Sequence, residues 1–310
     1  MQTDTLTVTF FSATISNPTT ALHIYMQRDV RPKTAAIYNE RLRPFLSQFA
    51  TLQEITPAHI NAWYASLSHL APTSRASYAQ TLKAFFNWCQ ADGRIQLSQN
   101  PAHHLKTKRA RSARNKAANE TDILKLLSYL EGKLLEERTA VTAIRDLLLV
   151  RLFYESGNRL TEIATLTLTA MATALRNGRI NQRGILIHTA YSDDGKRGSV
   201  PVRFSEYTAA AYRQWTENRP PGGTRVFVSV RETTAVPLHK QSITNILTRR
   251  CRQASLPPIR PHAIRHLKGT TVCDAYGPAA AAAMLNISFD VAQQHYYDAT
   301  ETAVLNATLL

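Results

Sequence analysis

The chain has few acidic residues for its size. Only 22 Asp and Glu stand against 37 Lys and Arg among 310 residues, which gives a formal net charge of +15 and a pI near 10.0. Such an excess of cations attracts a polyanion over a long range, and nucleic acid is the leading candidate. No run of about eighteen apolar residues is present, and the cations do not flank an apolar anchor, so no membrane partner is expected.

Cysteine is equally scarce. Cys89, Cys251 and Cys273 are odd in number, widely spaced and set in helical patterns. This usage is typical of small buried hydrophobic residues in a reducing compartment, so neither a disulfide nor a zinc site is expected. Asp4 stands where a secretory signal would carry basic residues, which favours a cytoplasmic, nucleoid-associated protein.

Two other features are missing. The sequence has no Gly-rich phosphate loop, and it has neither an H-E-x-x-H segment nor a paired-carboxylate metal motif. We therefore expect chemistry that needs neither ATP nor a metal ion, and no cofactor.

The first third of the chain has the pattern of a small helical domain. A hydrophobic content of 44% in 310 residues suits two folded domains. Residues 1–16 have the composition of an extended or disordered arm, and the helical domain is expected to span 17–104. Its expected helices begin with Pro near the first turn or follow a capping residue, and they span residues 19–29, 32–50, 57–70 and 72–92. Pro44 is expected to kink the second of them.

A basic segment separates this domain from the rest. Residues 106–116 hold six cations and no acid, within a linker expected at 105–118. The cations of the segment are Lys106, Lys108, Arg109, Arg111, Arg114 and Lys116. Such a run is either a solvated tail or, as we expect in a chain this basic, a contact to DNA phosphates. Arg75 and Lys83, on the polar faces of the preceding helices, are further candidates for DNA contact.

The remaining residues, 119–310, have mostly helical patterns with a short hairpin. Strands are expected at 184–189 and 199–202, on either side of a turn that contains Asp-Gly. Helices are expected at 119–136, 139–156, 205–218, 239–254, 262–276, 278–285 and 290–297. The fold class is therefore mainly α with a small antiparallel β-sheet.

The segment P-H-A-I-R-H, residues 261–266, carries chemistry suited to a phosphodiester. His262 and Arg265 are three residues apart and would share one helical face. A guanidinium grips two phosphate oxygens at once, and an imidazole holds or moves a proton. About thirty residues later stands the pair Tyr296–Tyr297, whose phenols are able to form a covalent ester with phosphorus. The plain alternative for His262 and Arg265 is a solvated helix face.

Four segments in this order resemble the signatures of tyrosine recombinases, the phage-integrase and Xer class of site-specific DNA recombinases. They are G-N-R-L-T-E from Gly157, the lysine of the β-turn, P-H-A-I-R-H, and H-Y-Y-D from His295. The resemblance implies an N-terminal helical core-binding (SAM-like) domain and a C-terminal tyrosine-recombinase catalytic domain that clamp DNA together. It also implies strand exchange through a 3′-phosphotyrosyl intermediate by a homo-tetramer on double-stranded DNA, with accessory DNA-bending proteins as further partners.

The resemblance gives roles to five residues. Arg159 and Arg265 match the arginines that grip the scissile phosphate, and His262 matches the histidine that contacts it and takes the tyrosine's proton. Lys196 matches the general acid that protonates the leaving 5′-oxygen, although it lies closer to the following strand than is usual, and Arg197 is the alternative. Tyr296 is the nucleophile by count.

Three neighbouring positions are assigned as well. Glu162 matches a structural acid, His266 a structural hydrogen-bonding residue, and Tyr297 is one residue out of register for the nucleophile.

One position departs from the family. Ile287 stands where a His or Trp normally contacts the phosphate, and Asn286 or His295 is then needed as a substitute donor. Losing one such donor costs about 3 kcal/mol of transition-state stabilisation. Three alternatives therefore stay open: a DNA-binding regulator on the same scaffold with weakened chemistry, a type IB topoisomerase, and an unrelated RNA-binding helical protein.

Overall fold

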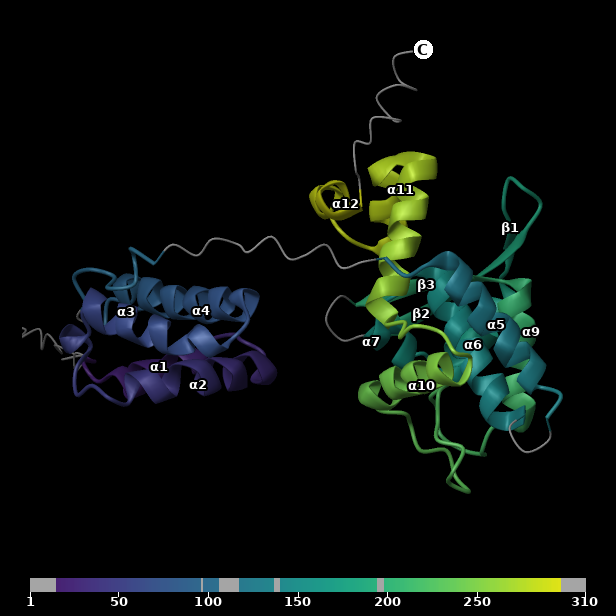
Figure 1. Ribbon diagram of the computed structural model, residues 1–310, viewed down its shortest axis with the longest axis horizontal. Coiled ribbons are helices and arrows are strands. Elements are labelled where there is room, and N and C mark those ends of the chain that lie inside the picture. Colours follow the sequence, from purple (N-terminus) through teal and green to yellow (C-terminus); the bar gives the residue numbers. More distant parts are fainter. Residues whose placement is uncertain (1–14, 96, 106–116, 137–139, 194–197, 297–310) are drawn as a thin grey trace, which may run out of the picture. The chain divides into compact units, whose positions relative to one another are not determined.

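A computed structural model describes residues 15–95, 97–105, 117–136, 140–193 and 198–296. The chain divides into two compact units, Met1–Ser112 and Ala113–Leu310 (Figure 1). Each unit has its own hydrophobic core. The cations predicted to contact DNA between residues 106 and 116 lie outside the described residues.

The N-terminal unit is a small helical bundle. Its α-helices are α1 (Pro18–Gln27), α2 (Pro32–Leu46), α3 (Pro57–Ser66) and α4 (Pro72–Ala91), with short 3-10 turns at Leu52–Glu54 and Leu67–His69. Each α-helix has Pro in its first turn, where the missing N–H has no intrahelical partner to lose. Phe85 and Phe86 on α4 are fully buried against α1 and α2, so aromatic side chains hold the bundle together.

Two helices in this unit are shorter than predicted. Helix α2 continues through Pro44 but ends at Leu46, four residues before the predicted end. The next residues have other partners, because the Glu54 carboxylate accepts hydrogen bonds from Ala50 N at 3.1 Å and Thr51 Oγ1 at 3.0 Å. The pattern from Pro57 to Leu70 likewise ends as an α-helix at Ser66 and continues as a 3-10 turn.

The second unit is mostly helical around a three-stranded sheet. Its helices are α5 (Glu120–Lys133), α6 (Ala140–Ser156), α7 (Leu160–Ala164), α8 (Leu168–Arg176), α9 (Glu206–Asn218), α10 (Lys240–Gln253), α11 (Pro261–Leu285) and α12 (Phe289–Tyr296). The strands are β1 (Arg179–Ile180), β2 (Leu186–Asp193) and β3 (Ser199–Ser205). They form an antiparallel sheet in the order β1-β2-β3, which confirms the predicted fold class.

Helix α6 is the centre of this unit. It packs against α5, α9, α10, α11 and β3, and its side chains are buried on nearly all sides. A helix that is apolar all round belongs in a core. The two ends of α6 therefore stand at opposite sides of the unit.

The hairpin and the long helix α11 differ in detail from the prediction. Strand β2 extends to Asp193 and β3 to Ser205, in continuous register from Ile187↔Ser205 to Asp193↔Ser199. The two predicted helices on either side of Gly277 form the single element α11, interrupted where Gly277 adopts φ 80°. Helix α8 and strand β1 were not predicted.

All three cysteines are free and buried, as predicted for small hydrophobic residues. None of the described helices combines the length and the apolar character that crossing a bilayer requires.

Candidate active site

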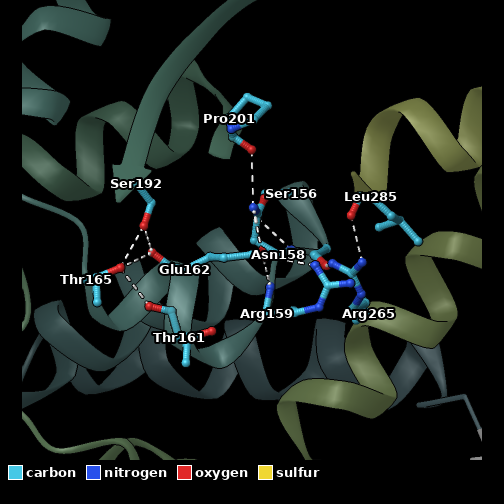
Figure 2. A network of polar contacts seen from close by, with 11 residues as sticks. Ser156, Asn158, Arg159, Thr161, Glu162, Thr165, Ser192, Pro201, Arg265 and Leu285 are labelled. Carbon is cyan, nitrogen blue, oxygen red and sulfur yellow. Dashed lines mark hydrogen bonds and ion pairs between the residues drawn. The ribbon is translucent and has the colours of Figure 1, made fainter. Parts of the chain in front are cut away.

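The turn between α6 and α7 presents Arg159. Gly157 ends α6 at φ 64°, and Arg159 precedes the first residue of α7. The fully buried Glu162 carboxylate accepts hydrogen bonds from the Arg159 backbone N at 2.6 Å and from Arg159 Nη1 at 2.9 Å (Figure 2). Glu162 therefore fixes both the backbone and the guanidinium of Arg159, which agrees with the structural role expected of this acid.

Glu162 is itself fastened to the sheet. Asn158 Nδ2 donates to Glu162 Oε2 at 3.0 Å and to the Pro201 carbonyl oxygen at 3.2 Å, and Ser192 Oγ donates to the Glu162 carbonyl oxygen at 2.6 Å (Figure 2). These bonds connect the α6–α7 turn to β2 and β3. The sequence analysis did not identify Asn158 or Ser192. Asn158 lies inside the G-N-R-L-T-E segment, whereas no sequence signal distinguishes Ser192.

Arg265 holds three segments together from the first turns of α11. Its side chain is buried, with Nη1 donating to the Gly157 carbonyl oxygen at 2.9 Å and Nη2 to the Leu285 carbonyl oxygen at 2.7 Å. Its guanidinium lies beside that of Arg159 (Figure 2). Burial lowers the pKa of Arg265, as does the charge of Arg159, while Tyr296 and Glu162 oppose the shift. Two adjacent guanidiniums favour an anionic ligand.

The rings of His262 and His266, on the same helix as Arg265, form a row of contacts with the ring of Tyr296, the candidate nucleophile. The His262 and His266 rings are 4.8 Å apart between centroids, and the His266 ring is 5.1 Å from that of Tyr296. His266 therefore contacts the tyrosine ring directly, and the exposed His262 lies one helical turn further away. From the sequence, the proton-accepting role was expected of His262 and a structural one of His266.

Both histidines are biased towards the neutral form. Burial lowers the pKa of His266 to about 4, helped by the neighbouring His262 and His295. The pKa of His262 is lowered as well: although the residue is solvent-exposed, part of its ring is desolvated, and the charges of Arg265 and Arg159 act in the same direction. At neutral pH each ring therefore keeps one nitrogen that is able to accept a proton.

Tyr296 is packed inside its own unit. It is only 6% exposed and belongs to a small apolar cluster with Cys273, Leu285 and three alanines of α11 and α12. A Cβ atom placed on Gly269 would lie 2.4 Å from Cδ1 and Cε1 of the Tyr296 ring. Only glycine at position 269 leaves room for this ring, and no sequence signal marked it.

Replacing Gly269 by Ala is expected to push the Tyr296 ring out of its place. Overpacking of this kind costs about 1–3 kcal/mol in the free energy of unfolding, and the amides of α12 should exchange with solvent faster. Urea denaturation and hydrogen exchange measure the two effects. Gly132→Ala in α5 is the matched control, because its Cβ would meet nothing within 4 Å. Equal behaviour of the two variants would contradict the packing argument.

An open pocket of about 430 Å³ lies beside Arg159. The rest of its lining is Asn286, Ile287 and Ser288 from the turn between α11 and α12, together with Val291 of α12. Ile287, which the resemblance places where a phosphate donor is expected, therefore lines the pocket beside Arg159. Of the two substitutes suggested from the sequence, Asn286 lines this pocket and His295 does not.

The other predicted site residues fall into two groups. Lys196, Arg197 and Tyr297 lie outside the described residues. Arg75 and Lys83 in the N-terminal unit are described, and both have intramolecular partners.

Arg75 and Lys83 each contact groups of the N-terminal unit. The guanidinium of Arg75 lies 4.6 Å from the centre of the Tyr64 ring. Lys83 Nζ donates to the carbonyl oxygens of Leu105 at 2.9 Å and His103 at 3.3 Å. Both side chains therefore support the bundle itself, and DNA contact by either stays a prediction.

Curated relatives of the chain are Xer recombinases. The chain is 25% identical to tyrosine recombinase XerC of Mycobacterium tuberculosis (strain ATCC 25177 / H37Ra) over 232 residues, 71% of each protein. It is 24% identical to XerC of Mycobacterium leprae (strain TN) over 262 residues, which cover 80% of the chain and 82% of the relative. The match to tyrosine recombinase XerD of Listeria monocytogenes (serovar 1/2a, strain ATCC BAA-679 / EGD-e) is 24% identical over 151 residues and spans 48% of XerD and 46% of the chain.

Solved structures share the fold. A lambda integrase dimer bound to a COC′ core site superimposes with a TM-score of 0.67 at 16% identity, over 94% of this chain and 79% of that one. The XerH site-specific recombinase in its post-cleavage complex with palindromic difH gives a TM-score of 0.68 at 14% identity, over 93% and 83% of the two chains.

The family assignment follows from the sequence profile. Residues 116–301, which include both arginines, His262 and Tyr296, match the Phage integrase family. This match covers more than half of the 310 residues. The chain therefore belongs to the phage integrase family.

Proposed function

We propose that the protein is a site-specific DNA recombinase that cuts and rejoins strands through a 3′-phosphotyrosyl intermediate. The observation that carries this proposal is that Arg159 and Arg265 lie side by side, next to the row of ring contacts from His262 through His266 to Tyr296. These residues come from distant parts of the sequence, and phosphodiester chemistry accounts for all of them. The Xer relatives support the same activity.

The reaction divides the work among the proposed residues. Arg159 and Arg265 bind the non-bridging oxygens of the scissile phosphate and stabilise the charge that develops on them. Tyr296 Oη attacks phosphorus and gives up its proton, which His262 finally accepts. His266 would relay this proton, because its ring lies between those of Tyr296 and His262. The bond from phosphorus to the 5′-oxygen breaks, and Lys196 gives a proton to that oxygen.

Rejoining reverses these steps with a different strand. The 5′-hydroxyl of the partner strand attacks the phosphotyrosyl ester, and the phenol leaves with its proton restored. The ester conserves the energy of the broken bond, so the exchange needs no ATP. The 6% exposure of Tyr296 means that α12 has to shift when DNA binds, before the phenol reaches the phosphate.

The partners are proposed on the same basis. Lambda integrase has been solved as a tetramer bound to a Holliday junction and XerH bound to its difH substrate, with TM-scores of 0.66 and 0.62. We propose that this chain likewise acts as a homo-tetramer on double-stranded DNA in the cytoplasm, with accessory DNA-bending proteins. The cations of residues 106–116 would neutralise phosphates of the DNA backbone.

The test is a covalent adduct. A duplex that the protein binds is first selected from random-sequence DNA by gel shift, then nicked beside candidate cleavage positions, end-labelled, incubated with the full chain and quenched with SDS. We expect a protein–DNA adduct through the 3′ phosphate and a free 5′-hydroxyl that a polynucleotide kinase phosphorylates.

Two outcomes would contradict the proposal. Specific binding without any adduct would make the chain a DNA-binding regulator. Relaxation of supercoiled plasmid without a preferred sequence would make it a topoisomerase-like enzyme.

A further inference from the structure

A second basic pocket lies at the other end of α6. Helix α6 contributes Thr142 and Arg145, and α10 and the segment before it supply the rest of a cavity of about 640 Å³. The arginines that line this cavity, named here the arginine pocket, are Arg145, Arg231, Arg249, Arg250 and Arg252. None of the described residues that line it is acidic.

A single buried carboxylate sits behind the arginine pocket. Asp146 is fully buried, and its Oδ1 accepts from Arg145 Nε at 2.8 Å and Nη2 at 2.6 Å. Its Oδ2 accepts from Arg250 Nε at 2.7 Å. Both guanidinium side chains are only 5% exposed, so two buried cations share one buried anion.

The remaining charge is positive and partly desolvated. A third cation, Arg249, is 3.6 Å from Asp146 Oδ2, and burial lowers its pKa, with the charges of Arg250 and Arg145 acting in the same direction. Asp146 opposes this shift, but its one negative charge is shared by three cations, of which Arg249 is 39% exposed. A partly desolvated cation without a full counter-charge is costly, because protein offers less solvation than water. An anion from outside would therefore be stabilised here, and the exposed Arg231 and Arg252 stand at the mouth to receive it.

The arginine pocket is separate from the candidate active site. Arg145 precedes Ser156, at the active-site end of α6, by eleven residues, which is about 16 Å along a helix axis. None of Arg159, His262, Arg265 and Tyr296 lines it.

We propose that the arginine pocket binds a phosphate group. Arginine forks match the oxygens of a phosphate. The five arginines that line the cavity exceed the single negative charge of Asp146, with which three of them pair. The phosphate has two possible sources. One is a DNA backbone position away from the scissile phosphate, and this source rests on the proposed function. The other is a free phosphate compound, which does not.

The first arm measures DNA binding by the full-length Tyr296→Phe chain, so that cleavage plays no part. Arg249→Ala and, separately, Arg231→Ala are compared with Arg176→Ala, which removes an exposed arginine on α8. If the phosphate belongs to DNA, the plot of log affinity against log salt becomes shallower by about 0.9 per lost contact. Arg176→Ala should leave the slope unchanged.

The second arm measures the melting temperature with inorganic pyrophosphate at constant ionic strength. A rise in the parent chain that Arg249→Ala and Arg231→Ala lose, with an unchanged salt slope for DNA, assigns the pocket to a free phosphate compound. Arg231 has no hydrogen bond to Asp146 among the described contacts, so its variant keeps the test valid if Arg249→Ala is unstable. The proposal is overturned if Arg249→Ala and Arg231→Ala both match Arg176→Ala in the salt slope and in the melting temperature. This holds whether or not Tyr296 is the nucleophile.

Discussion

Replacing Tyr296 by Phe is expected to abolish the covalent adduct. The substitution removes the phenol oxygen and keeps the ring that packs against His266 and Gly269, so the fold and DNA binding should persist. Loss of a nucleophile typically lowers the rate by at least ~10³-fold. The adduct assay with nicked, end-labelled DNA measures the rate, and gel shift and urea denaturation check binding and folding.

Tyr297→Phe is the matched control for this substitution. The two positions are adjacent in sequence, and Tyr297 is one residue out of register with the expected nucleophile. We expect the adduct to form normally in Tyr297→Phe. Loss of the adduct in Tyr297→Phe with retention in Tyr296→Phe would move the nucleophile by one residue and show that the buried phenol is structural.

Arg265→Lys is expected to impair both chemistry and stability, although it keeps the positive charge. A lysine ammonium has no planar fork, so it is unable to bridge the Gly157 and Leu285 carbonyl oxygens as Arg265 does. A buried carbonyl left unsatisfied costs about 1–3 kcal/mol in the free energy of unfolding. Loss of a preorganised donor to the phosphate lowers the cleavage rate by roughly 10²–10³-fold.

The measurements for Arg265→Lys are urea denaturation and adduct formation at saturating DNA. Arg176→Lys, on the exposed side of α8, controls for the exchange of residue type. A variant with wild-type cleavage and reduced stability would make Arg265 a purely structural residue. A variant with wild-type stability would contradict the importance of the two carbonyl contacts.

Local sequence signals account for most of the helices. Pro at the first turn and capping residues such as Asn17 and Asn119 mark where helices begin. Helix ends were less predictable, because they depend on contacts made after folding. The Glu54 carboxylate, which binds the backbone beyond α2, is an example. Helix α8 was not predicted although six of its nine residues are Ala, Leu or Met, because it is short and its position is set by packing against β2.

In the candidate site, too, local relations were predictable from the sequence and relations that depend on tertiary packing were not. His262 and Arg265 share a helix, and Arg159 and Glu162 share a turn, so spacing alone placed each pair. The relation of His266 and Gly269 to Tyr296 depends on how α12 folds back onto α11, which no local pattern encodes. The contact of Arg250 with Asp146 joins residues 104 positions apart, and it too could not be predicted from the sequence.

The cluster around Tyr296 also determines how tightly the proposed nucleophile is held. Alanines supply half of its buried members, and it is distinct from the main core around α6. Small side chains bury little apolar area, so the free energy that keeps α12 docked is a fraction of the global stability. The conformation with the Tyr296 phenol buried and the one with it exposed are then two states of a local equilibrium. We expect DNA to shift that equilibrium by binding better to the open state, while the core of the domain stays folded.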